Sequence, residues 1–195
     1  MNPRLIKYFL VTLGIIAAVL AVIFGSYQPF AKSQFFIKAL RNQNNIKTFD
    51  QFKQNFDAAF NSPSQIGDEE LAKFLSDSVI SLISSQNQAE DVSRALVAYI
   101  EPHMFRNDVG QLLAYGDMRT VLFRRFHQEA DLKKAEETYL QAFAIGPKLP
   151  PVLYSLLDLY SIARDAGKFK QTAETVLTYW PDDARLKSAL TPVVK

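Results

Sequence analysis

The chain has 195 residues, of which 48% are hydrophobic and 22% are charged, and it contains no cysteine. This composition is typical of a globular protein, and the absence of cysteine excludes disulfides and thiolate metal sites. Of the 22 Lys and Arg residues, Arg4 and Lys7 precede the first apolar segment, so the remaining 20 balance the 20 acidic residues. A neutral domain without a basic, aromatic-rich stripe argues against nucleic-acid binding.

The first predicted element is a helix over the apolar run of 20 residues from Tyr8 to Tyr27. At 1.5 Å per residue, 20 helical residues span about 30 Å, which is the thickness of the hydrocarbon core of a bilayer. We therefore predict a single-pass membrane anchor with tyrosines at both interfaces. The predicted anchor residues are Tyr8, Phe9, Leu10, Ile15, Ile16, Leu20, Ile23, Phe24 and Tyr27.

A cleaved signal peptide is the main alternative to this anchor, because Arg4 and Lys7 provide a basic start. The run is longer than a typical signal-peptide core, and more apolar residues follow the best cleavage site, Val19-Leu20-Ala21, so we favour an uncleaved anchor. A short basic tail usually stays in the cytoplasm. We therefore expect the rest of the chain to lie outside the cytoplasm.

The chain after Gln28-Pro29 predicts successive helices, because apolar residues recur at three- and four-residue spacing and nothing alternates with period two. A short apolar face over 35–40 ends at the polar stretch 42–45. Thr48 and Gln51 form a candidate capping box. The Phe-rich stripe from Phe49 to Phe60 follows it, and we interpret this stripe as core.

Further helix starts are expected at Asp68–Glu70, where acidic residues favour a helix N-terminus, and at Asn87 with Glu90. The inward face of the helix after Asn87 is predicted to comprise Val92, Ala95, Leu96, Tyr99 and Ile100. The remaining predicted helices begin at Asn107-Asp108 and then cover about 131–145, 151–166, 169–180 and 183–190.

The segment "KKAEETYLQAFAIGP" places Ala135, Tyr139, Ala142 and Pro147 at fixed offsets, and Pro181 lies 34 residues after Pro147. Units of 34 residues can therefore be drawn at 116–149 and 150–183. Corresponding positions are both apolar, as in the pairs Leu122/Leu156 and Phe126/Tyr160. A 34-residue helix-turn-helix period is the tetratricopeptide spacing.

These residues resemble the second helix of a tetratricopeptide repeat, with small Ala135 and Ala142, aromatic Tyr139 and the closing Pro147. "FDQFKQNFDAAFNSP" resembles the same pattern less closely. The repeats are degenerate, since Phe123 and Phe169 stand where the family prefers small residues. The resemblance implies an all-α fold, in which a right-handed solenoid of helical hairpins follows the transmembrane helix.

The whole chain also resembles the C-terminal tail of bacterial O-antigen ligase or polymerase-type membrane proteins that end in tetratricopeptide repeats. The resemblance rests on an apolar span, a Phe-rich "FKQNFDAAFNSPSQIGDEELAKFL" segment and degenerate hairpins. In those proteins the glycosyl-transfer site lies in a multi-span region. No catalytic residue can therefore be transferred to this chain.

Motifs for catalysis, cofactors or metals are absent from the sequence, and His103 and His127 do not have metal-ligand spacing. We therefore expect no catalytic, cofactor or metal site. Arg119, Arg124, Arg125, His127, Lys133 and Lys134 form a basic cluster. It is interpreted as a hydrated surface balanced by nearby acidic residues, with contact to an acidic peptide or an anionic headgroup in the groove as the alternative.

The sequence thus predicts an anchor domain over 1–31 and a tetratricopeptide-like domain over 32–195. The expected function is a non-enzymatic scaffold that binds a protein partner at the membrane, with multi-span proteins among the candidate partners. The predicted groove residues are Arg119, Phe123, His127, Tyr154, Asp158 and Ser161. Two alternatives stay open: an accessory tail or fragment of a glycan ligase or polymerase, and a secreted soluble helical protein.

Overall fold

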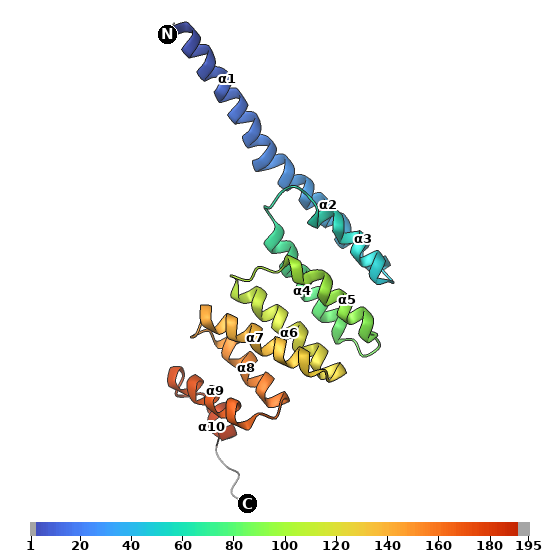
Figure 1. Cartoon of the computed structure of the whole chain (residues 1–195), viewed down its shortest axis with the longest axis vertical. Coiled ribbons are helices and arrows are strands. Elements are labelled where there is room, and N and C mark those ends of the chain that lie inside the picture. Colours follow the sequence, from blue (N-terminus) through green and yellow to red (C-terminus); the bar gives the residue numbers. More distant parts are fainter. Residues whose placement is uncertain (1–2, 191–195) are drawn as a thin grey trace, which may run out of the picture. The chain divides into compact units, whose positions relative to one another are not determined.

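The structure is a computed structural model that describes residues 3–190. These residues form helices joined by turns and loops, without strands (Figure 1), so the all-α prediction is confirmed. The chain divides into two compact units, Met1–Leu71 and Ala72–Lys195. The division falls after the first four residues of helix α4 (Asp68–Ser84).

The first unit begins with an uninterrupted helical run made of α1 (Pro3–Val22), the π-helical turn η1 (Ile23–Tyr27) and α2 (Gln28–Asn42). We expected successive separate helices after Gln28-Pro29, but the helix continues through Pro29. A proline lacks the backbone N–H and crowds the preceding turn, so it normally breaks a helix interior. Here the wider π turn lies immediately before it and changes the hydrogen-bond register locally.

Helix α3 (Phe49–Phe60) packs against α2 in the first unit. The Thr48 hydroxyl accepts a hydrogen bond from the backbone N–H of Gln51 at 3.2 Å, as an N-cap should. The Gln51 side chain accepts from the N–H of Lys47 rather than that of Thr48, so the capping box is only half formed. Phe52, Phe56 and Ala59 are buried, and the interpretation of this stripe as core is therefore confirmed.

Helix α5 (Glu90–Ile100) and the 3₁₀ turn η3 (Glu101–His103) follow α4 in the second unit. The predicted start at Asn87 is wrong, because the N-cap is Ala89. Leu96 and Ile100 of the predicted face of α5 are buried, whereas Ser93 and Val97 complete the buried face and the predicted Val92, Ala95 and Tyr99 are only partly buried. Ser93 can be buried because its hydroxyl donates to the carbonyl of Ala89 at 2.8 Å.

The second unit continues with α6 (Val109–Phe126), α7 (Glu129–Ile145), α8 (Pro150–Ile162), α9 (Ala166–Tyr179) and α10 (Ala184–Leu190). These helices lie close to the predicted ranges. Helix α6 packs against α7, α7 against α8, and α8 against α9 (Figure 1). Because the links are short, each of these neighbouring pairs forms a helical hairpin.

Small residues allow α6 and α7 to approach closely. Ala135, Tyr139 and Ala142 on α7 are buried, as the repeat pattern predicts. A Cβ atom at Gly116 on α6 would lie only 2.3 Å from the ring of Tyr139. Glycine at this position therefore lets the aromatic ring lie directly on the backbone of the neighbouring helix.

The end of the α8–α9 pair is covered by Trp180. Its half-buried side chain packs against the cluster that contains Leu153, Leu157, Val176 and Leu186. Tyr179 packs against the same cluster and meets Trp180 edge-on.

Candidate functional site

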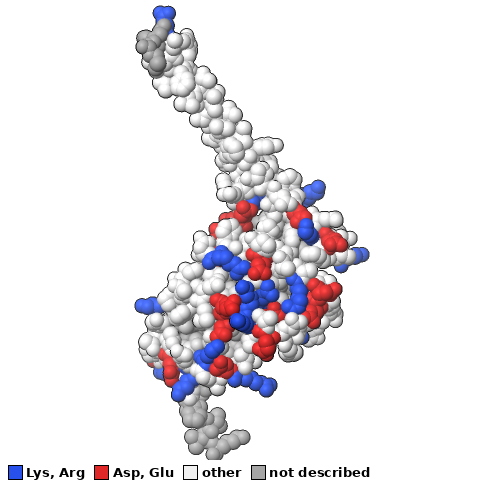
Figure 2. Space-filling view, viewed as in Figure 1, with Lys and Arg blue, Asp and Glu red and all other residues white. Residues whose placement is uncertain are grey.

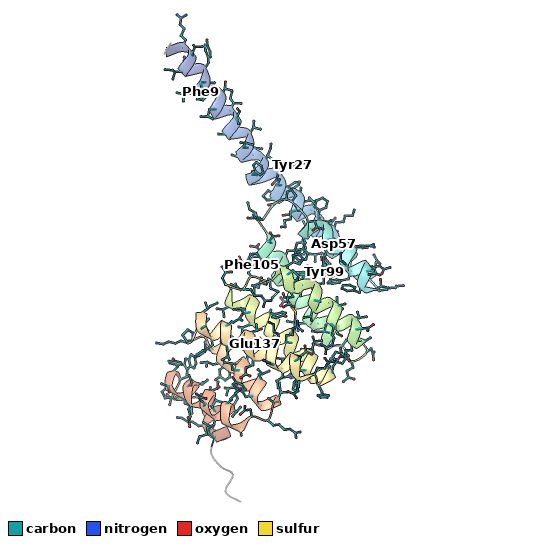
Figure 3. The ribbon with its side chains drawn as sticks, viewed as in Figure 1. Phe9, Tyr27, Asp57, Tyr99, Phe105 and Glu137 are labelled. Atoms are coloured by element: carbon teal, nitrogen blue, oxygen red, sulfur yellow. The ribbon has the colours of Figure 1, made fainter. Side chains whose placement is uncertain are left out.

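The predicted anchor lies on α1 and η1 and is exposed along its length. Tyr8 is 69% exposed, Phe9 68% and Tyr27 68%. Phe9 and Tyr27 project away from the helix (Figure 3), and none of the most apolar stretch is buried. The other predicted anchor residues, Leu10, Ile15, Ile16, Leu20, Ile23 and Phe24, are also exposed. The chain thus has one N-terminal helix that is long and apolar enough to span a membrane.

A buried ion pair lies just after this apolar helix, still within the first unit. The Lys32 side chain on α2 is only 4% exposed, and its ammonium pairs with Asp68 at the start of α4. The same ammonium donates to the carbonyl of Ser64 at 2.7 Å. The contact ties the turn at 61–67 to the side of α2. Nothing in the sequence pattern distinguished Lys32 from the other lysines near the anchor.

The second unit contains a network of charges, here called the arginine network, made of Arg94, Glu101, Arg119 and Asp131. The Asp131 carboxylate on α7 is buried and accepts from Arg94 at 2.9 Å and from Arg119 at 3.1 Å. Arg119 also pairs with Glu101 on η3 at 3.0 Å. In the space-filling view, positive and negative side chains gather on this unit (Figure 2). The network joins α5 and η3 to α6 and α7.

Tyr115 strengthens the arginine network, because its hydroxyl accepts from the Arg119 guanidinium at 2.6 Å. Burial opposes ionisation of Glu101, but a hydrogen bond from Tyr115 and the charges of Arg119 and Arg106 lower the pKa of its carboxyl below the usual value. The charged carboxylate of Glu101 therefore stabilises the fold at pH values above the pKa that this carboxyl has in the unfolded chain. This contribution is lost as the pH falls through the lowered folded-state value.

Arg125 has a structural role that its place in the predicted basic cluster did not indicate. Its guanidinium donates to the carbonyls of Ile83 at 2.6 Å, Gln88 at 2.6 Å and Gln86 at 3.2 Å. It thus satisfies backbone acceptors at the end of α4 and in the loop before α5. Arg119 and Arg125 therefore bind within the unit, whereas Arg124 and Lys133 are exposed.

Three of the predicted groove residues lie on or next to α6. Arg119 is half-buried in the arginine network and is directed towards other helices of its own unit. Phe123 is half-buried and meets His127 edge-on. His127 is exposed and ends α6 in the left-handed conformation with a φ of 55°, while its N–H donates to the carbonyl of Phe123.

The other three predicted groove residues lie on α8. The hydroxyl of Tyr154 hydrogen-bonds to Asp183, and the Arg185 guanidinium lies over its ring. Asp158 and Ser161 are exposed. The exposed members of the predicted set are therefore His127, Asp158 and Ser161.

A hydrogen-bonded cluster of Asp117, Thr120 and Tyr139 connects α6 to α7. The Tyr139 hydroxyl donates to the Asp117 carboxylate at 2.6 Å and lies 3.2 Å from the Thr120 hydroxyl. Burial raises the pKa of the Asp117 carboxyl above its usual value, and the nearby Asp158 charge adds to this rise, while Tyr139 and Arg124 oppose it. The repeat pattern indicated Tyr139 as an aromatic packing residue but did not indicate the carboxylate that its hydroxyl binds.

Within residues 3–190, His, Asp and Glu side chains do not form groups of three that could hold a metal ion. Comparison with protein-family models, with curated proteins and with solved structures gives no match to this chain.

Proposed function

We propose that this protein is a single-pass membrane protein whose helical hairpins bind a protein partner next to the bilayer, without catalysis of their own. The observation that carries the proposal is the exposed apolar helix from Leu5 to Tyr27, which continues directly into α2. Leaving this many large apolar side chains in water is unfavourable, and a bilayer of matching thickness would cover them.

The binding part of the proposal rests on the hairpins of the second unit. The interpretation of α6–α9 as tetratricopeptide-like is supported by the burial of Ala135, Tyr139 and Ala142, because these positions hold the helices together in that repeat. In such arrays the first helix of each hairpin lines the binding face. Asp158 and Ser161 on α8 have the exposure that a partner contact requires.

The arginine network and Arg125 support a scaffold role because they connect α4, α5, α6 and α7 through several charge-assisted bonds. Such bonds are stronger than neutral hydrogen bonds and have defined directions. A rigid surface loses little conformational entropy when a partner binds. A protein located at the same membrane is the partner class that this arrangement fits.

Photo-crosslinking in native membranes tests the proposed surface. A photoreactive residue at position 158 or 161 should crosslink to one and the same protein, whereas one at Lys170 or Glu174 on the exposed side of α9 should not. Charge reversal by Asp158→Arg should abolish the crosslink from position 161 without changing the helical content. Equal crosslinking from α8 and α9, or an unchanged crosslink in Asp158→Arg, would contradict the proposed binding face.

A further inference from the structure

The turn at 61–67 lies next to the part of α2 that immediately follows the proposed span. Lys32 is the residue that holds it there, through Ser64 and Asp68. Ile66 and Gly67 line one pocket together with Lys32, Ser33 and Phe36, so Ile66 lies beside this part of α2. All of these residues belong to the first unit.

The depth of this turn relative to the bilayer follows from helix geometry. If the hydrocarbon core ends at Tyr27, Lys32 lies five residues further, or about 7.5 Å along the axis at 1.5 Å per residue, which is the outer part of the headgroup layer. The headgroup layer on each side of a bilayer is about 5–7.5 Å thick. Helical side chains also tilt towards the N-terminus of their helix, which directs the Lys32 ammonium back towards the membrane.

The composition of the turn fits this depth. Asn61 to Gly67 carry no charge, and Ile66 at the tip is 60% exposed. Lys32 is neutralised by Asp68, so it does not require bulk water. Phe30, two residues before Lys32 and therefore on the opposite side of α2, is 61% exposed. Apolar side chains thus project on two sides of the helix at the level where interfacial aromatic residues are found.

We infer that the turn at 61–67 is a second membrane contact, with Ile66 inserted into the headgroup layer of the bilayer that α1 spans. The inference depends on the proposed membrane span. The occupant of the surface is lipid rather than a protein, because the depth of the turn follows from its attachment to the spanning helix. A lone exposed isoleucine would be unremarkable on a soluble surface, and it is the depth that gives Ile66 this role.

Because the chain has no cysteine, single reporters can be placed by Ile66→Cys, Ala17→Cys and Gln54→Cys. Each full-length variant is labelled with an environment-sensitive fluorophore and reconstituted into phosphatidylcholine vesicles. Some vesicles carry a nitroxide in the headgroup region and others carry it deep in the acyl chains. Ala17 reports on the span, whereas Gln54 on α3 is exposed and serves as the reference for water.

The expected result is a blue-shifted emission at position 66, strong quenching by the headgroup nitroxide, and at least a halving of iodide quenching relative to position 54. Position 17 should be quenched best by the deep nitroxide. If position 17 is protected but position 66 is as accessible to iodide as position 54, the inference is overturned and the span remains. Protection of position 66 without nitroxide quenching would also overturn it. Iodide access to position 17 would overturn the span and the inference together.

Discussion

At the scale of single residues, some charged groups of the second unit are shielded from water and have their hydrogen-bond partners on a different helix. Asp117 illustrates this, because its carboxylate accepts from Tyr139 on α7 while burial raises its pKa. Nothing in the sequence around Asp117 indicates that it is shielded from water. Its environment depends on the distance between two helices, which a sequence pattern does not contain.

Asp117→Asn should make the fold more stable at neutral pH. Because the pKa of Asp117 is higher in the folded protein than in the unfolded chain, the unfolded chain loses this proton at a lower pH than the folded protein does. The parent protein therefore loses stability as the pH rises from the unfolded-state pKa through the folded-state pKa. Asparagine removes this titration and can still accept the hydrogen bond from Tyr139. We expect a higher Tm than the parent at pH 7 and a vanishing difference below about pH 4, near the usual pKa of an aspartate.

The measurement is the Tm of the full chain in detergent across this pH range. Circular dichroism monitors the thermal unfolding. Asp182→Asn is the matched control, because that side chain is fully exposed, and it should show no such trend. A parent and an Asp117→Asn variant with parallel pH profiles would show that Asp117 is not shielded in the way the structure indicates.

At the scale of helices, the contact between α6 and α7 is set by Gly116 and Tyr139. An isolated glycine within a helical pattern indicates a packing or functional reason, and "LLAYGDMRTV" contains such a glycine. That signal was available in the sequence but does not identify the partner of the glycine. Only the structure shows that Tyr139 occupies the space in which a Cβ would lie.

Gly116→Ala should destabilise the second unit even though alanine is the better helix former. Its Cβ would overlap the Tyr139 ring, and overpacking of this kind costs about 1–3 kcal/mol. Gly167→Ala on α9 is the matched control, because the nearest atom to its Cβ, at 3.5 Å, is at ordinary contact distance. There alanine should be neutral or stabilising by up to about 1 kcal/mol.

Urea unfolding of the two glycine variants in the same detergent compares their free energies of unfolding directly. Hydrogen exchange of the amides in α6 and α7 should increase in Gly116→Ala and remain unchanged in Gly167→Ala. If both variants were equally stable, α6 and α7 would not be packed as closely as the structure describes.

At the scale of the whole molecule, the N-terminal helix is long and apolar enough to span a membrane. Its most apolar stretch makes no buried contact within the described residues 3–190, so its side chains are available to lipid. Its length matches the hydrocarbon core of a bilayer without adjustment.

The double substitution Ile15→Lys and Ile16→Lys should abolish stable membrane insertion. A lysine near the centre of a spanning helix costs about 2.5–3.5 kcal/mol on the insertion scale. Two such residues outweigh much of the apolar gain, so the chain should be released from membranes by alkaline carbonate. The matched control is Leu140→Lys with Ile145→Lys, which adds the same charge at exposed positions of α7 and should not cause release. Equal retention of both variants would contradict the span.

The sequence by itself determined the helical class, the long apolar helix at the N-terminus and the approximate ranges of most helices, because these follow from local composition and from periodicity along one chain. On the predicted face of α5, Leu96 and Ile100 are buried as expected, but Ser93 and Val97 are buried in place of neighbouring predicted residues, because a burial pattern shifted by one residue also satisfies helical spacing. The burial of Lys32, the partners of Arg119 and Arg125, and the contact of Gly116 with Tyr139 were decided only by the tertiary structure. These features depend on which side chains from distant segments meet, and that is a property of packing in three dimensions.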